Sequence, residues 1–279
     1  QSDDFILKIV KEHFLQHSES RPFEIVEVGC RSFRLMTQIE DSIPGAKLTA
    51  FDQNHSALKV CRDQMDTDKP ALKIGRAENY QHHTVVDVFF SQGEHHLIPK
   101  PASMYLKNLA KQLSPNGIII LSDEFLSNYD HALQRQIKSI IWHAHTIATV
   151  LKEGQEELAK EEARFLLSDL ADHEDQRFMD TDEALDLVCK RAPEIDIAVR
   201  RDQKFADGIA TDLLQKLIAQ FPGTIKEVRS KKGAYKICEA AMLLEAEEAG
   251  LRVLSSKSFG PIRTIGGLSN FVLGQKSLG

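Results

Sequence analysis

Short apolar runs alternate with segments of helical spacing over the first 125 residues of the chain. In the helical segments, apolar positions recur every three to four residues, over residues 3–17, 35–39, 57–65 and 102–113. The runs between them are rich in apolar and β-branched residues and cover residues 23–29, 47–52, 71–75, 84–90 and 118–122. Such alternation predicts a parallel sheet with helices on both faces.

The pattern changes after the fifth strand-like run. Residues 129–221 are strongly charged and keep helical spacing without a further strand. Alternation then returns with a helix over 234–249, which ends at Gly250, and with strands over 251–256 and 270–274. We expect these last two strands to form an antiparallel edge on the sheet.

The chain is therefore predicted to be an α/β protein with a doubly wound, mainly parallel seven-stranded sheet. A helical insertion follows the fifth strand. The sheet domain is expected over residues 1–128 and 223–279, and the insertion over residues 129–222. An insertion at this point acts either as a lid that closes over a ligand or as a surface for a homodimer, and the sequence leaves both open.

Composition and charge argue against several classes of protein. Of the 279 residues, 42% are hydrophobic and 27% are charged, and the formal net charge is −6. This acidic balance argues against a nucleic-acid binder, which carries a basic surplus. There is no apolar run of about 18 residues to span a membrane, and the charged start is unlike a signal peptide. We expect a cytoplasmic protein, and we expect it to be a processed or excised part of a longer one, because it begins with Gln1 rather than Met.

Cysteine and histidine positions predict neither a metal site nor a disulfide framework. The four cysteines form no CxxC pair, which favours a reducing compartment. The histidine pairs are not expected to bind one metal ion together. Adjacent residues on a strand face opposite ways, and residues two apart on a helix face different sides. The cysteines are Cys30, Cys61, Cys189 and Cys238, and the histidine pairs are His82-His83, His95-His96 and His143 with His145.

Polar residues follow the first two predicted strands. In a doubly wound sheet, ligands bind at the carboxyl ends of the strands. The first strand ends in Glu27-Val28-Gly29, and the second ends at Asp52, 23 positions beyond Gly29. A carboxylate at this place suits the two hydroxyls of a ribose, because it accepts a hydrogen bond from each of them.

This arrangement resembles the class I S-adenosylmethionine-dependent methyltransferases, over residues 1–125 and 234–279. The resemblance lies in Glu27-Val28-Gly29, Asp52, Ala77-Glu78-Asn79, Asp87 and the segment Leu113-Ser114-Pro115-Asn116-Gly117. That last segment predicts a turn and stands where the family has Leu-x-Pro-Gly-Gly. The resemblance implies a Rossmann-like methyltransferase fold with S-adenosylmethionine as the cofactor. It also implies direct displacement of the methyl group by a small-molecule acceptor beneath the helical insertion.

The resemblance also implies roles for individual residues. Asp52 would hold the ribose, Gly29 would admit the methionine end of the cofactor, and Glu78 would lie near the adenine. The full set of expected cofactor contacts is Glu27, Gly29, Cys30, Asp52, Gln53, Ala77, Glu78 and Ser91. The candidates for a catalytic base are His95, His96, Glu124 and His131, and the acceptor pocket is expected to be lined by Phe125, Tyr129 and Trp142.

The sequence departs from the family pattern at the cofactor site. Arg31 and Phe33 stand where the family has two further loop glycines, and Arg76 stands where an acid meets the adenine amine. The polar segment 91–96 is also unusual. A catalytically inactive binding or scaffold protein with an altered pocket is therefore the alternative. A nicotinamide-dependent oxidoreductase is disfavoured because GxGxxG is absent, and a nucleic-acid methyltransferase is disfavoured because there is no basic surplus.

Overall fold

The computed structural model divides into two compact units, and each is described by itself. The sheet unit comprises residues 1–124, 241–258 and 268–279, and the helical unit comprises residues 125–240 and 259–267. The structure describes residues 2–17, 21–30, 33–63, 70–93, 102–170, 181–220, 237–259 and 265–276. No helix within these ranges is both long enough and apolar enough to cross a membrane.

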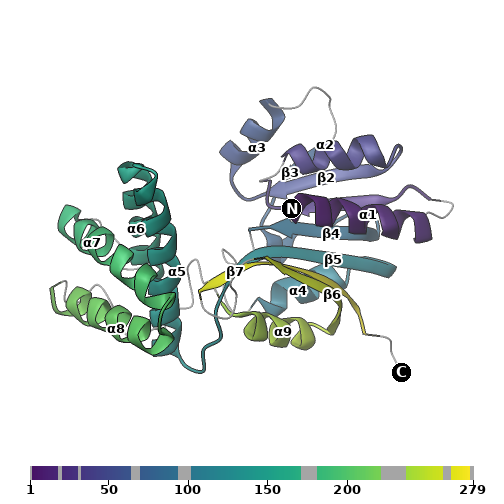
Figure 1. Ribbon diagram of the computed structural model, residues 1–279. Coiled ribbons are helices and arrows are strands. Elements are labelled where there is room, and N and C mark those ends of the chain that lie inside the picture. The colour runs from purple at the N-terminus through teal and green to yellow at the C-terminus, as the bar shows by residue number, and fades with distance from the viewer. Residues whose placement is uncertain are drawn as a thin grey trace. The chain divides into compact units, whose positions relative to one another are not determined.

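The sheet unit is built on a seven-stranded sheet (Figure 1). β1 pairs in parallel with β2 and β4, β2 with β3, and β4 with β5. The chain thus starts mid-sheet, moves to one edge, and then returns to build the other side, which is the doubly wound arrangement. The order is β3-β2-β1-β4-β5-β7-β6, with β1 Glu24–Val28, β2 Lys47–Asp52, β3 Ala71–Ile74, β4 Val86–Gln92, β5 Leu113–Leu126, β6 Leu251–Phe259 and β7 Gly266–Gln275.

Helices cover both faces of this sheet. Ile6 of α1, Leu35 of α2 and Leu58 of α3 share one apolar cluster with side chains of the strands. α4 connects β4 to β5, where the direction of winding has reversed, so a right-handed crossover puts it on the opposite face. α9 lies beside α4, because the Ala102 N–H donates to Glu245 (3.1 Å). The bounds are α1 Ser2–His17, α2 Phe33–Ser42, α3 His55–Asp63, α4 Ser103–Ala110 and α9 Glu239–Glu248.

β6 and β7 run antiparallel to each other. The Lys276 N–H donates to the Gly250 carbonyl oxygen (3.1 Å), and the Ser269 hydroxyl donates to the Ser258 hydroxyl (2.9 Å). Residue numbers therefore fall along one strand as they rise along the other. The antiparallel edge predicted from the sequence is confirmed.

β5 is longer than predicted, because the expected turn over residues 114–117 lies inside it. Val86 of β4 pairs with Leu113, and Val88 pairs with Ile118, so residues 114–117 form a bulge in β5. A Cβ added at Gly117 would lie 2.8 Å from the Val86 carbonyl oxygen. The turn prediction was wrong because glycine lets the bulge pass close to the neighbouring backbone while the strand continues.

Gly117→Ala is expected to destabilise the protein by about 1–3 kcal/mol, because the new methyl group overlaps backbone that cannot move aside. Gly208→Ala is the matched control. Gly208 lies inside the helix α8 (Gln203–Gln220) with no atom within 4 Å of an added Cβ, so alanine there is expected to stabilise by about 0.5–1 kcal/mol. Urea unfolding of the two variants checks the opposite signs. A neutral Gly117→Ala would show that the bulge relaxes freely.

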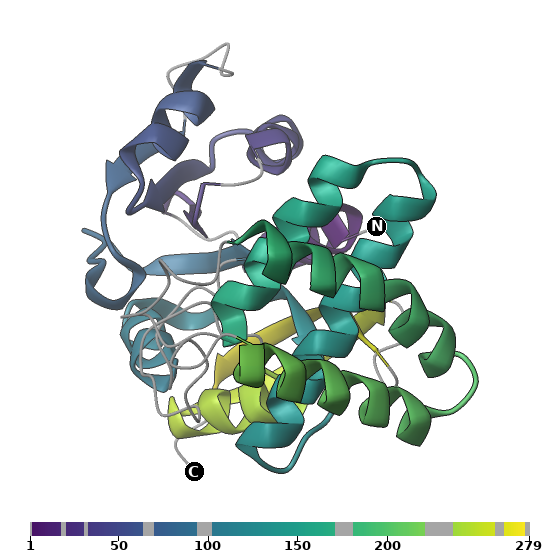
Figure 2. The ribbon, with the colours of Figure 1, turned by 90° about the vertical axis from the view of Figure 1, so that its left-hand side faces the viewer.

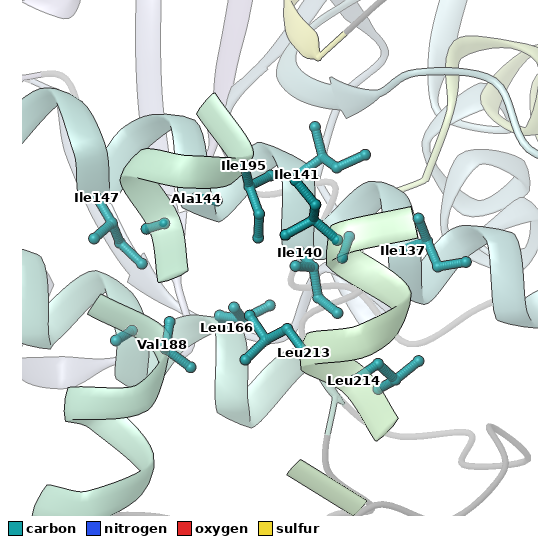
Figure 3. Close-up of a cluster of buried hydrophobic side chains, with 14 of the residues drawn as sticks. Ile137, Ile140, Ile141, Ala144, Ile147, Leu166, Val188, Ile195, Leu213 and Leu214 are labelled. Carbon is teal, nitrogen blue, oxygen red and sulfur yellow. The ribbon is translucent and has the colours of Figure 1, made fainter. Parts of the chain in front are cut away.

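Four helices form most of the helical unit (Figure 2). Apolar residues at three-to-four spacing line one side of each helix, and they meet in a common core. Leu166, Ile195 and Leu213, from three different helices, point into that core (Figure 3). The bounds are α5 Ala132–Lys152, α6 Glu156–Leu170, α7 Asp182–Val199 and α8 Gln203–Gln220.

The buried carboxylate of Asp169 is held between α5 and α6. Arg135 Nη2 donates to Asp169 Oδ1 (2.5 Å), and the Ser139 hydroxyl donates to Oδ2. Arg135, Ser139 and Asp169 are 6%, 0% and 9% exposed. Because water does not reach these groups, their side chains rely on hydrogen bonds within the protein, and these two are among them.

A second buried carboxylate, Asp196 of α7, receives its partners from the surface. His145 Nδ1 lies 2.7 Å from Oδ1, and Lys152 Nζ donates to Oδ2 (3.0 Å). Burial by itself raises the pKa of Asp196, but hydrogen bonds from His145, Lys152 and Arg200 outweigh it and hold the pKa below its ordinary value. Asp196 is therefore kept ionised by its neighbours.

Candidate functional site

The carboxyl ends of the central parallel strands meet at one edge of the sheet. Val28 at the end of β1 pairs with Phe51 of β2 and Ser91 of β4. Gln92 of β4 pairs with Ser122 of β5. The polar residues that follow these strands therefore share the edge at which ligands bind in doubly wound sheets.

Asp52 lies directly against the loop that follows β1. The Cys30 N–H donates to Asp52 Oδ2 (3.0 Å), and the Asn54 N–H donates to Oδ1 (2.7 Å). Gly29 has φ of +82°, a left-handed conformation that favours glycine and turns the chain toward Asp52. The carboxylate thus organises the backbone of both strand ends and keeps some of its roughly four acceptor positions.

Cys30 and Cys61 form a disulfide, which corrects the expectation that the chain has none. Their Cα atoms are 6.8 Å apart, although 31 positions separate them in sequence. The pairing arises because β1 and β2 are neighbours, so the loop after β1 faces the helix after β2. A search for closely spaced cysteines such as CxxC cannot detect this pairing. The Cys30 side chain is engaged in this bond, so only its backbone is left to contact a cofactor.

Glu27 and Ser91 are both buried where β1 and β4 meet. Glu27 is 0% exposed and pairs with Ala50 and Phe90 on the neighbouring strands. Ser91 is 1% exposed, and its hydroxyl makes no hydrogen bond within the described part of the chain. A buried hydroxyl without a partner is uncommon and calls for an explanation.

The segment after β3 is held in place by the chain around it. Ala77 and Glu78 lie in the short helix η1 (Ala77–Asn79), and Asn108 of α4 donates to the Ala77 carbonyl oxygen (3.3 Å). The Tyr80 ring stacks on Phe51 of β2, with centroids 3.8 Å apart. Glu78 is half-buried, whereas Gln53 and Arg76 are exposed.

A row of polar side chains crosses β4, β5 and β7 beneath the start of α1, and sequence analysis missed it. This polar row consists of Gln92, Ser122 and Asn270. The Ser2 hydroxyl lies 2.8 Å from the Ser122 hydroxyl and donates to Asn270 Oδ1 (3.0 Å), and Gln92 donates to Asp3 (2.9 Å). No local signal could have found the row, because its three residues lie on strands that are far apart in the sequence and neighbours in the sheet.

The candidate bases lie in different parts of the chain. Glu124 is an exposed residue of β5 whose N–H donates to Asp123 Oδ1 (2.7 Å). His131 belongs to the helical unit and caps α5, where its Nδ1 accepts from the Gln134 N–H (3.3 Å). His95, His96, Arg31 and the side chain of Phe33 lie outside the described residues.

The expected acceptor-pocket residues Phe125, Tyr129 and Trp142 all belong to the helical unit. Phe125 is 1% exposed, and Trp142 packs against the apolar core of the helices. Over the described ranges, no group of three or more acidic, histidine or cysteine side chains is placed to hold a metal ion. His143 Nδ1 instead lies 2.6 Å from Glu162.

Asp87, one of the residues that carry the resemblance, lies near the amino end of β4 rather than at the ligand edge. It is 3% exposed and accepts from the Ser114 hydroxyl (2.8 Å), from the Glu24 N–H (3.0 Å) and from Arg21. These contacts tie β1, β4 and β5 together. Asp87 therefore has a structural role.

A second polar cluster lies near the same amino end. The Tyr80 hydroxyl lies 2.8 Å from His82 Nδ1, and His82 Nε2 lies 3.3 Å from Glu24. Burial, assisted by the Glu24 charge, raises the pKa of Tyr80 to about 12, and burial lowers the pKa of His82. Both groups are thus neutral at pH 7, which suits a buried hydrogen-bonded chain.

No protein-family model matches the sequence, and no curated protein matches it. Solved structures do match. An S-adenosylmethionine-dependent methyltransferase from Clostridium acetobutylicum is 10% identical with a TM-score of 0.52, covering 99% of this chain and 91% of the other. LepI, solved in complex with S-adenosylmethionine, is 9% identical with a TM-score of 0.50, covering 96% and 46%.

A third match is a pericyclic reaction enzyme, 9% identical with a TM-score of 0.50, covering 96% of this chain and 47% of the other. The chain thus spans about half the length of several matched proteins, including 54% of the mitomycin 7-O-methyltransferase MmcR. Identities this low carry information on fold and not on reaction. They show that this chain has the fold of the S-adenosylmethionine-dependent methyltransferases.

Proposed function

We propose that the chain binds S-adenosylmethionine at the carboxyl edge of its sheet and transfers the methyl group to a small-molecule acceptor. The observation that carries this proposal is the position of Asp52, at the end of β2 and against the Gly29-Cys30 backbone. That position suits a ribose, and the fold is one in which solved relatives bind this cofactor. The remaining contacts are proposed for Glu27, Gln53, Ala77, Glu78 and Ser91.

Two observations on the chain support the fit of this cofactor. The Asp52 carboxylate accepts from two backbone N–H groups, and the rest of its roughly four acceptor positions can serve ribose hydroxyls. The Ser91 hydroxyl is buried and makes no hydrogen bond to any described residue, so a polar atom of a ligand would satisfy it. Arg76 is exposed.

The cofactor supplies an electrophilic methyl group on a sulfonium when it is bound. The protein then needs only to align an acceptor with that group and to exclude water. We propose that the polar row and Asp3 orient a hydroxyl or amine of the acceptor, since the row contains hydrogen-bond donors and acceptors and Asp3 is an acceptor beside the end of β4. Glu124, His95, His96 and His131 remain the proposed bases for an acceptor that must lose a proton.

The helices of residues 129–222 are proposed to form a lid over this site, with Phe125, Tyr129 and Trp142 lining the acceptor side. A lid excludes water and selects the acceptor. The apolar core of the helical unit supports this proposal, because it lets the four helices move as one body. A homodimer contact is the competing role, and the molar mass of the chain in solution separates the two.

A catalytically inactive binding protein is the alternative function. This alternative rests on the sequence, because Arg31 and Phe33 stand in place of two loop glycines of the family and Arg76 in place of an acid. Isothermal titration with S-adenosylhomocysteine and S-adenosylmethionine is the test of the cofactor site. We expect binding at micromolar strength, about −8 kcal/mol.

The control ligand in this titration is NADH, which tests whether the chain is a nicotinamide-dependent oxidoreductase. We expect it to give no heat of binding. Absence of heat and of a thermal shift at millimolar S-adenosyl ligand would contradict the proposed site. Binding without methyl transfer to any hydroxyl or amine acceptor would favour the inactive binding protein.

A further inference from the structure

The Cys30–Cys61 disulfide links the proposed cofactor loop to the helix that follows the proposed ribose acid. Cys30 comes directly after Gly29, and Cys61 lies in the last turn of α3. The 6.8 Å between their Cα atoms is within the roughly 4.4–6.8 Å that disulfides span. The bond therefore closes a loop that contains β2 and Asp52.

Cys30 is held on two sides, by the acid and by the second cysteine. Its N–H donates to Asp52 Oδ2 (3.0 Å), and its carbonyl oxygen lies 3.2 Å from Cys61 Sγ. In the dithiol form, the same position lets the Cys61 thiol donate to that carbonyl oxygen. Any movement of the sulfurs therefore acts on the backbone that carries the Asp52 contact.

We propose that Cys30 and Cys61 form a reversible modification site whose oxidation strengthens binding of the S-adenosyl ligand. This inference rests on the proposed function. The oxidant is a low-molecular-weight disulfide such as oxidised glutathione. One cysteine thiolate attacks it, forms a mixed disulfide and releases one thiol; the second cysteine then attacks, forms the Cys30–Cys61 bond and releases the other. Two electrons pass to the oxidant, and the two thiol protons leave on the released thiols.

The oxidised form binds more tightly because the crosslink fixes the Gly29-Cys30 backbone before the ligand arrives. A site whose backbone is already fixed loses less conformational entropy on binding. Both cysteines are nearly buried, at 6% and 5% exposed, so exchange requires local opening of α3 or the loop. Coupling is reciprocal, so the bound ligand should protect the disulfide from reduction by the same factor.

Labelling of the unfolded protein with iodoacetamide tests the crosslink. After equilibration with oxidised glutathione, we expect labels on Cys189 and Cys238, which are the free cysteines, and a peptide that joins Cys30 to Cys61. After dithiothreitol, all four cysteines should be labelled. Four labels in the oxidised sample would overturn the proposal.

Titration with S-adenosylhomocysteine tests the coupling. We expect the oxidised chain to bind at least about fivefold more tightly than the reduced chain. Cys61→Ser should bind like the reduced chain with or without oxidant, whereas Cys189→Ser, a matched change in the helical unit, should behave as the unmodified chain does. The dithiothreitol concentration that reduces half of the disulfide should also rise when the ligand is present.

Two failures are distinguishable here. Equal affinity in the oxidised and reduced forms would overturn the coupling and leave the cofactor site intact. Absence of binding in both forms would overturn the proposed function and the coupling with it, while the labelling result would still decide whether the two cysteines pair.

Discussion

Asp52→Ala is expected to weaken binding of S-adenosylhomocysteine by about 100-fold. In the proposed site the change would remove two charge-assisted hydrogen bonds to the ribose, each worth about 1.5 kcal/mol or more, and every 1.4 kcal/mol is about tenfold in affinity. It also removes the acceptor for the N–H groups of Cys30 and Asn54. Isothermal titration of the variant beside the unmodified chain measures the effect.

Two further variants sharpen this result. Asp63→Ala removes an exposed acid at the end of α3 and should leave the affinity unchanged. Asp52→Asn keeps one acceptor oxygen and should fall between the other two. An Asp52→Ala protein that is folded, by circular dichroism, and binds within threefold of the unmodified chain would remove Asp52 from the cofactor site.

Asp169→Ala is expected to destabilise the helical unit by about 3–5 kcal/mol. The substitution removes the carboxylate from the buried pair of Asp169 and Arg135, and loss of one partner of a buried pair is costly. The Ser139 hydroxyl loses its acceptor as well. Guanidinium unfolding followed by the fluorescence of Trp142, the one tryptophan of the chain, measures the change.

The matched control is Asp186→Ala, which breaks an exposed pair with Lys160 at 3.8 Å on the same unit. Exposed pairs contribute little, so we expect a change of less than about 1 kcal/mol. The double variant Arg135→Met, Asp169→Leu should recover most of the stability, because apolar residues replace a buried pair well. Equal losses for Asp169→Ala and Asp186→Ala would show that water reaches the buried pair.

Much of the fold could be predicted from the sequence because its signals are local. The bounds of β2 (Lys47–Asp52) follow from hydrophobic spacing within one element, and the structure has the same bounds. The bulge at residues 114–117 could not be predicted in this way. Its composition is that of a turn. Only the pairing with β4 shows that β5 continues after the bulge.

The candidate site also contains residues that local sequence signals predict and residues that they do not. Asp52 could be singled out because a residue at the end of a parallel strand must lie at the carboxyl edge. The Cys30–Cys61 pair, the polar row and the structural role of Asp87 depend on which strands are neighbours and in what register. Those facts lie in contacts between distant parts of the chain, which spacing along one element does not record.

The strand order has a consequence for how the protein is made. β7 lies beside β5 in the sheet, yet the whole helical segment is synthesised between Leu126 and Gly266. At 5–20 residues per second, a ribosome takes roughly 7–28 s to cross that interval. For that time one side of β5 has no partner strand, and an unpaired edge invites association with other chains. The helices α5–α8 fold through local contacts and can form during the delay, so the sheet is the last part of the molecule to be completed.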